Sequence, residues 1–181
     1  MMAPRTRSSR SSGPPLALTK FVEEQYPRVE GALVLYTGDR ARAQELTQET
    51  FARVCQHWDR VERMAAPGPW VHRVAMNLAH SAHRRRGAER RATERAVARG
   101  EGAERSAPDA PLELSELVRT ALGDLPERER AVVVLRFYAD LSVDETAAAL
   151  GIPTGTVKTT TRRAMATLRD SGLLTEVSVD E

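Results

Sequence analysis

The chain has 181 residues, enough for one medium domain or two small ones. Lys and Arg number 27 and Asp and Glu number 25, so the formal charge of +2 does not by itself indicate a nucleic-acid partner. Cys55 is the single cysteine, which excludes an internal disulfide, and no apolar run approaches the ~18 residues that span a bilayer. No apolar segment follows the N-terminal arginines as it would in a signal peptide, so we expect a cytoplasmic protein that does not bind membranes.

The charges are unevenly distributed along the chain. Residues 84–99 contain seven Arg and two Glu, and residues 152–169 contain four basic residues and no acid. Residues 112–151 contain eight acids and four Arg. Such alternation is expected when separate surfaces meet separate partners.

The N-terminal half predicts a tail followed by helices. Residues 1–15 are rich in Ser, Arg, Pro and Gly and predict a disordered basic tail. Apolar residues then recur at helical spacing from Leu18 to Tyr36, and Pro27 should kink this helix or start a second one. Gly38 and Asp39 should end it and cap the next helix, which is expected over residues 39–61.

The rest of the chain continues the helical pattern after one interruption. A Pro-Gly-Pro turn at residues 67–69 interrupts the chain, and a third helix starts there and runs to about residue 86. Residues 87–111 predict a flexible linker, helical at its Ala/Arg/Glu-rich start, and periodicity returns from residue 112. No stretch alternates like a strand, so we predict an all-α chain of two small helical domains, at 16–86 and 112–172, with a C-terminal tail at 173–181.

Residues 142–169 predict a helix-turn-helix. Ser142 and Glu145 have capping-box spacing, and Gly151 can supply the left-handed residue that ends the first helix. Pro153 and Thr154 should start the second helix, with Thr154 as its N-cap. The side chains expected inside are those of Val157, Thr161, Ala164 and Leu168.

The opposite face of that second helix is expected to be exposed, basic and rich in hydroxyls. Arg and Lys match guanine edges and phosphates, and Thr matches phosphates and thymine methyl groups. This chemistry favours binding in the major groove over a merely solvated amphipathic helix. The face comprises Thr156, Lys158, Thr159, Thr160, Arg162 and Arg163.

The third helix has a second polar face. Arg73, Asn77, His80 and Arg84 are spaced by 4, 3 and 4 residues and share one side, and Trp70 opens the helix. Such side chains can read base edges, stack on unpaired bases and hold phosphates. From the residues alone, a solvated polar face explains the pattern equally well.

Two groups of motifs resemble the bacterial sigma factors of the extracytoplasmic-function (ECF) type, group IV of the major sigma family. LPERER at 125–130, VLRFY at 134–138, LGIP at 150–153 and GTVK at 155–158 resemble the C-terminal DNA-binding region. AQELTQETF at 43–51 resembles the helix that docks on RNA polymerase, and WVHRVAMNLA at 70–79 resembles the helix that engages the −10 element. The match covers about residues 21–169 in the ECF order.

The resemblance implies a transcription initiation factor that directs core RNA polymerase to promoters, with no enzymatic activity, cofactor or metal. The polymerase β′ clamp helices would bind Glu45, Leu46, Gln48, Glu49 and Arg53. The −10 element would be melted and captured by Trp70, Arg73, Asn77, His80, Arg84 and Arg85. The −35 duplex would be read by Thr154, Thr156, Lys158, Thr160, Arg162 and Arg163. The implied partners also include the polymerase β flap, promoter DNA and an anti-sigma factor.

Four residues depart from the family pattern: Met76, Ser81, Thr160 and Thr161. They leave the promoter sequence open. Two other functional classes also remain, a stand-alone helix-turn-helix regulator and a protein-only adaptor such as an anti-sigma factor. A zinc site at His80 and His83 is disfavoured because no carboxylate lies beside them in the sequence.

Overall fold

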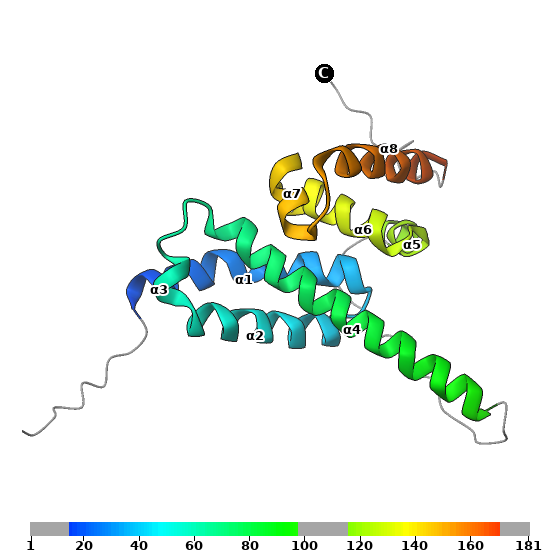
Figure 1. The fold of residues 1–181 in the computed structure, drawn as a ribbon, viewed down its shortest axis with the longest axis horizontal. Coiled ribbons are helices and arrows are strands. Elements are labelled where there is room, and N and C mark those ends of the chain that lie inside the picture. Colours follow the sequence, from blue (N-terminus) through cyan, green and yellow to red (C-terminus); the bar gives the residue numbers. More distant parts are fainter. Residues whose placement is uncertain (1–14, 98–115, 171–181) are drawn as a thin grey trace, which may run out of the picture.

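The computed structural model describes residues 15–97 and 116–170, and every regular element in these two ranges is a helix (Figure 1). The all-α prediction is therefore confirmed. The first domain contains α1 (Leu16–Thr37), α2 (Arg40–Gln56), α3 (Trp58–Val61) and α4 (Pro67–Val97). The second contains α5 (Glu116–Asp124), α6 (Glu127–Val133), the π-helical turn η1 (Val134–Tyr138), α7 (Val143–Leu150) and α8 (Thr154–Asp170). The predicted tails and most of the predicted linker lie outside the described residues, which exclude 1–14, 98–115 and 171–181.

The corner between α1 and α2 is built by the two predicted capping residues. Gly38 adopts the left-handed conformation, with φ of 67°, and its N–H donates to the Val34 carbonyl. The Asp39 carboxylate accepts a hydrogen bond of 2.9 Å from the Arg42 N–H. α1 runs through Pro27 without starting a second helix, although the proline removes one helical N–H.

The helix predicted over residues 39–61 is interrupted, so that prediction is wrong in this detail. His57 leaves helical geometry, with φ of −116° and ψ of 18°, and its N–H is shared between the Arg53 and Val54 carbonyls. The chain then continues as the short α3. Because Trp58 and Val61 on α3 remain buried, the apolar pattern persists across the break and conceals it in the sequence.

The core of the first domain lies between α1, α2 and α4. Val29, Leu33, Val54 and Val71 are fully buried there, and each contributes roughly 1.5–3 kcal/mol relative to an exposed side chain. Aromatic pairs close one end, with ring centroids 5.4 Å apart for Phe21–Trp58 and 5.2 Å apart for Tyr26–Phe51.

α4 is the longest element, with 31 residues and a length of about 46 Å. It continues past Gly87 to Val97, so the start of the predicted linker is helical, as its composition indicated. Figure 1 shows its far end extending beyond the rest of the molecule. Within the described residues, no helix is both long and apolar enough to cross a membrane.

The two domains pack against each other. α7 lies against α4, and η1 lies against α1. The buried cluster of the first domain extends without a gap into the second through Ala131, Val134, Leu135, Leu141 and Ala149. Two smaller clusters lie within the second domain and hold α8 against α5 and α6, and α7 against α8.

Candidate nucleic-acid interface

The helix-turn-helix is formed by α7, the turn at residues 151–153 and α8. The Ser142 hydroxyl accepts from the Glu145 N–H at 3.2 Å, and the Glu145 carboxylate accepts from the Ser142 N–H at 2.7 Å. These bonds complete the predicted capping box, and they hold the pKa of Glu145 below its ordinary value. Gly151 is left-handed, with φ of 64°, and ends α7 as predicted.

The start of α8 differs by one residue from the prediction. The Pro153 carbonyl accepts hydrogen bonds from the Thr156 and Val157 N–H groups, so Pro153 occupies the cap position. Thr154 is the first residue of the helix and is not its N-cap. Its side chain is exposed beside the helix N-terminus, where N–H groups favour an anion.

The exposed face of α8 agrees with the prediction except at one residue. Lys158, Thr159, Arg162 and Arg163 are exposed, and Thr156 is half-buried. Residues 154–169 contain no acid. This side of α8 therefore offers cations and hydroxyls together.

Thr160 was predicted to lie on that exposed face, and this is wrong: its side chain is only 8% exposed. Val157, Ala164 and Leu168 are buried as predicted, but the fourth inward position is Thr160 and not Thr161. Thr161 is half-buried, and its hydroxyl donates to the Val157 carbonyl at 2.8 Å. With Thr160, the inward residues are spaced by 3, 4 and 4 positions, and with Thr161 they are spaced by 4, 3 and 4. Both spacings fit one face of a helix, so the sequence could not show which threonine is buried.

The polar face of α4 is present as an exposed surface. Arg73, Asn77, His80, Arg84 and Arg85 are all exposed. Trp70 is half-buried against the core at the start of this helix. An amide, an imidazole and several guanidinium groups thus follow one another along α4.

α2 presents a third exposed surface. Glu45, Gln48, Glu49 and Arg53 are exposed, with ion pairs of 2.6 Å for Arg42–Glu45 and 2.6 Å for Arg53–Glu49. Leu46 was predicted to contact the polymerase, but its side chain is 3% exposed and belongs to the core. Leu46 can therefore stabilise α2 by packing in the core, but it cannot contact a partner directly.

Both halves of the chain match known protein families. Residues 21–89 match the family model of Sigma-70 region 2, and residues 121–170 match that of Sigma-70 region 4. The RNA polymerase sigma-E factor of Streptomyces coelicolor is 35% identical over 73% of this chain and 72% of its own length. The ECF RNA polymerase sigma factor SigL of Mycobacterium tuberculosis is 32% identical over 89% of this chain and 94% of its own length.

The chain is an ECF sigma factor. It is therefore an RNA polymerase sigma factor that acts in transcription initiation. Its fold resembles the sigma factor RpoE of Bartonella quintana, solved in complex with the anti-sigma factor NepR. The TM-score is 0.72 at 21% identity, covering 91% of this chain and 99% of that one. A second similar fold is CnrH, solved with the cytosolic domain of CnrY, with a TM-score of 0.60 at 24% identity.

The departures of this sigma factor from the family pattern have different structural settings. Met76 is 3% exposed and belongs to the core behind Asn77. Ser81 is exposed on α4. Thr160 is buried and Thr161 is half-buried, so neither presents a fully exposed side chain to a partner.

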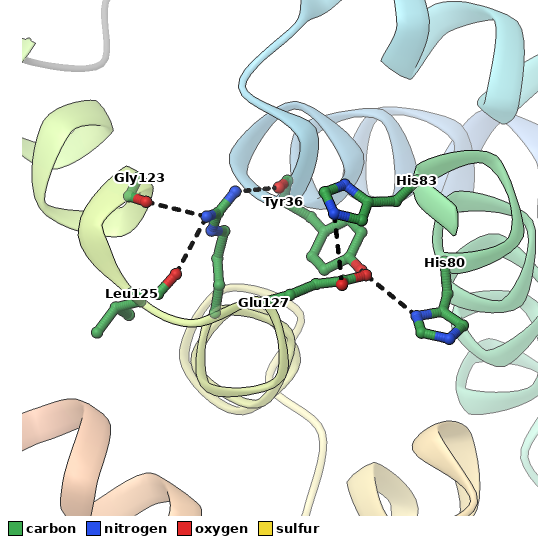
Figure 2. A network of polar contacts seen from close by, with 7 residues as sticks. Tyr36, His80, His83, Gly123, Leu125 and Glu127 are labelled. Atoms are coloured by element: carbon green, nitrogen blue, oxygen red, sulfur yellow. Dashed lines mark hydrogen bonds and ion pairs between the residues drawn. The ribbon is translucent and has the colours of Figure 1, made fainter. Parts of the chain in front are cut away.

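A polar contact that was not predicted from the sequence joins region 2 and region 4 of this sigma factor (Figure 2). Glu127 opens α6, and its carboxylate accepts a hydrogen bond of 2.5 Å from the Tyr36 hydroxyl. The same carboxylate lies 3.0 Å from His80 Nδ1 and 3.5 Å from His83 Nε2. The carboxylate that the sequence lacks beside these histidines is thus supplied from 47 residues away. Within the described residues, no group of three such side chains is arranged to hold a metal ion.

This contact changes the ionisation of its members. Burial alone would raise the pKa of Glu127, but hydrogen bonds from Tyr36 and His80, with charge on His83 and His80, lower it overall. Burial raises the pKa of Tyr36, and the hydrogen bond to the Glu127 carboxylate raises it further. The phenol therefore remains a donor, and the carboxylate remains charged at neutral pH.

Proposed function

We propose that this sigma factor binds core RNA polymerase through α2, reads the −35 duplex with α8 and captures the unpaired −10 element on α4. One observation carries this proposal. The chain exposes two basic helix faces with different chemistry, one rich in hydroxyls and free of acid and the other carrying an amide and an imidazole. Family membership supports placing the two faces on one promoter.

The face of α8 suits a duplex. An α-helix fits the major groove, and its N-terminal residues reach base edges while its basic side chains meet phosphates. Each good bidentate pairing with a base contributes roughly 1–3 kcal/mol of discrimination. The contact set in this proposal excludes the buried Thr160 and consists of Thr154, Thr156, Lys158, Arg162 and Arg163.

The face of α4 suits single-stranded bases. Removing a base from the stack costs a few kcal/mol, and stacking on a protein side chain returns roughly 1–3 kcal/mol per base. Capture on α4 would therefore couple recognition to strand opening without ATP hydrolysis. We assign base contact to Asn77, stacking to Trp70 and His80, and phosphate contact to Arg73, Arg84 and Arg85.

The remaining contacts are with proteins. The exposed carboxylates and amide of α2, at Glu45, Gln48 and Glu49, together with Arg53, would meet the polymerase β′ clamp helices. The second domain would meet the β flap. The sigma factor RpoE, which has a similar fold, was solved in complex with the anti-sigma factor NepR. We propose an anti-sigma factor as a further partner of this chain.

The test is run-off transcription by core polymerase, on a promoter found by sequencing transcripts after induced expression. Asn77→Ala should retain −35 duplex binding and lose the permanganate-reactive bubble. Lys158→Ala should weaken duplex binding by about tenfold and flatten its salt dependence, because one phosphate or base contact is lost. Arg169→Ala is the matched control, since this exposed residue lies eleven positions after Lys158, about 16 Å along the same helix.

Two results would contradict the proposal. A normal bubble with Asn77→Ala would remove α4 from −10 capture. Tight, specific duplex binding by the chain alone, with no effect on core polymerase, would instead favour a stand-alone regulator.

A further inference from the structure

The polar contact around Glu127 joins elements that belong to different domains. Tyr36 lies in the last turn of α1 and His80 lies midway along α4, whereas Glu127 starts α6. Figure 2 shows the labelled Tyr36, His80 and His83 side chains directed towards the same carboxylate. Charge-assisted hydrogen bonds of this kind are about twice as strong as neutral ones.

Arg130 adds a second polar bridge one turn further along α6. Its guanidinium donates to the Tyr36 carbonyl at 3.0 Å, at the end of α1. The same group donates to the Gly123 and Leu125 carbonyls at 3.0 and 3.1 Å, in its own domain. Two side chains of one short helix therefore fasten the second domain to the end of α1.

The contact occupies the face of α4 to which the proposed function assigns the −10 strand. Glu127 holds His80 and places a negative charge beside Arg84 and Arg85, where DNA phosphates would have to lie. A cavity of about 290 Å³ opens next to it. Its walls come from both domains and comprise Tyr36, Met76, Asn77, His80, Glu127, Arg128, Ala131, Leu150 and Ile152.

The second wall of that cavity is part of the helix-turn-helix. Leu150 and Ile152 flank the Gly151 turn, and Asn77 of α4 lines the same cavity. A strand bound along Asn77 and His80 would have to enter between the domains. A strand bound to His80 would have to displace Glu127, so the arrangement seen here opposes strand capture on α4.

We propose that the free chain holds itself in a closed, autoinhibited arrangement, with Glu127 as the latch that keeps the second domain over the strand-binding face of α4. The claim that closure inhibits DNA binding rests on the proposed function, whereas the claim that the domains are closed does not. Opening must break the contacts of Glu127 and Arg130 and separate the apolar surfaces that join the domains. In this proposal only the open form binds single-stranded DNA. Closure therefore lowers the apparent affinity of the free chain for single-stranded DNA.

Closure can be measured directly in the full chain by single-molecule energy transfer between two dyes. Cys55 on α2 supplies one exposed thiol, and Ala166→Cys supplies the other on an exposed position of α8. Glu127→Ala should shift the closed-to-open ratio by roughly fivefold or more towards the open form. Glu129→Ala is the matched control, because both carboxylates lie in the first turn of α6 and interact alike with the helix dipole.

Tyr36→Phe is the second variant, and it retains the charge of Glu127. It removes one hydroxyl from a buried side chain, so the core should be preserved, and it should also favour the open form. Binding of a 20-nucleotide oligo(dT) to the free chain should tighten by a similar factor in both variants. With Tyr36→Phe, such a gain cannot arise from a lost negative charge.

Each result decides a separate part of the inference. Unchanged energy transfer in both Glu127→Ala and Tyr36→Phe would overturn the latch. Opening without tighter oligo(dT) binding would overturn autoinhibition. If Asn77→Ala leaves promoter melting intact while the latch variants open, the proposed function fails and the latch stands.

Discussion

His72 is a buried histidine that the proposed function does not use. It lies on α4 with 2% of its surface exposed, and its Nδ1 is without a hydrogen-bond partner in the part of the chain that the structure describes. Burial, together with the charge of Arg28, lowers the pKa of His72 from 6.5 to about 4. The folded first domain therefore requires a neutral imidazole.

We predict that this histidine makes the protein less stable in mild acid. Above pH 6.5 the imidazole is neutral in both states, so its ionisation does not change the stability. As the pH falls from 6.5 to about 4, the unfolded chain binds a proton that the folded chain does not, and about 3 kcal/mol of stability is lost. Thermal melting of the wild type and His72→Leu across this range measures the effect. The difference between the two proteins should grow towards pH 4, and parallel curves would show that His72 is not responsible.

At the scale of single elements, the capping box on α7 contributes to stability through two local hydrogen bonds. Ser142→Ala removes the hydroxyl that accepts from Glu145 and should cost about 1 kcal/mol in urea unfolding. Thr154→Ala is the control, because Pro153 occupies the cap position of α8. An equal loss in both variants would contradict the assignment of the two caps.

The helix ends could be predicted from the sequence because their chemistry is local. Gly38, Asp39, Ser142 and Gly151 each act on backbone groups within five residues of themselves. The inward face of α8 could not be predicted equally well. Thr160 and Thr161 have the same volume and polarity, and only the packing of α8 on the rest of its domain selects which of them is buried.

The contact between the domains could not be predicted at all. Glu127 meets Tyr36 across 91 positions and His80 across 47, and no sequence spacing relates such residues. In the sequence, Glu127 is one carboxylate in a run of alternating charges that resembles a solvated helix start. The exposed faces of α2, α4 and α8 follow from helical periodicity, so most of their residues could be predicted, with Leu46 and Thr160 as the exceptions. How these faces are arranged relative to one another depends on the tertiary fold.

At the scale of the whole molecule, the two domains lie close together where Tyr138 of η1 packs over Gly31 of α1. A Cβ added at this position of α1 would overlap the hydroxyl of Tyr138 from η1. Gly31→Ala should favour α1 by up to ~1 kcal/mol through helix propensity, yet it should shift the domains towards the open form. The two-dye energy transfer described above measures the shift.

The double variant Gly31→Ala, Tyr138→Ala provides the control for this prediction. Removing the phenol frees the space that the new methyl group needs, so closure should return while the helix remains stabilised. If the double variant stays as open as the single one, the overlap at Tyr138 is not the cause.

Because α4 continues as a helix beyond Gly87, its length sets the direction in which the chain leaves the first domain. Because the helix turns by about 100° and advances about 1.5 Å with each residue, the azimuth at which the chain leaves Val97 is fixed by residue count. One extra residue after Ala88 would turn the end of α4 by about 100° about the helix axis. Seven extra residues would complete almost two turns and restore the direction to within about 20°. The direction in which the chain leaves α4 is therefore periodic in the length of this helix.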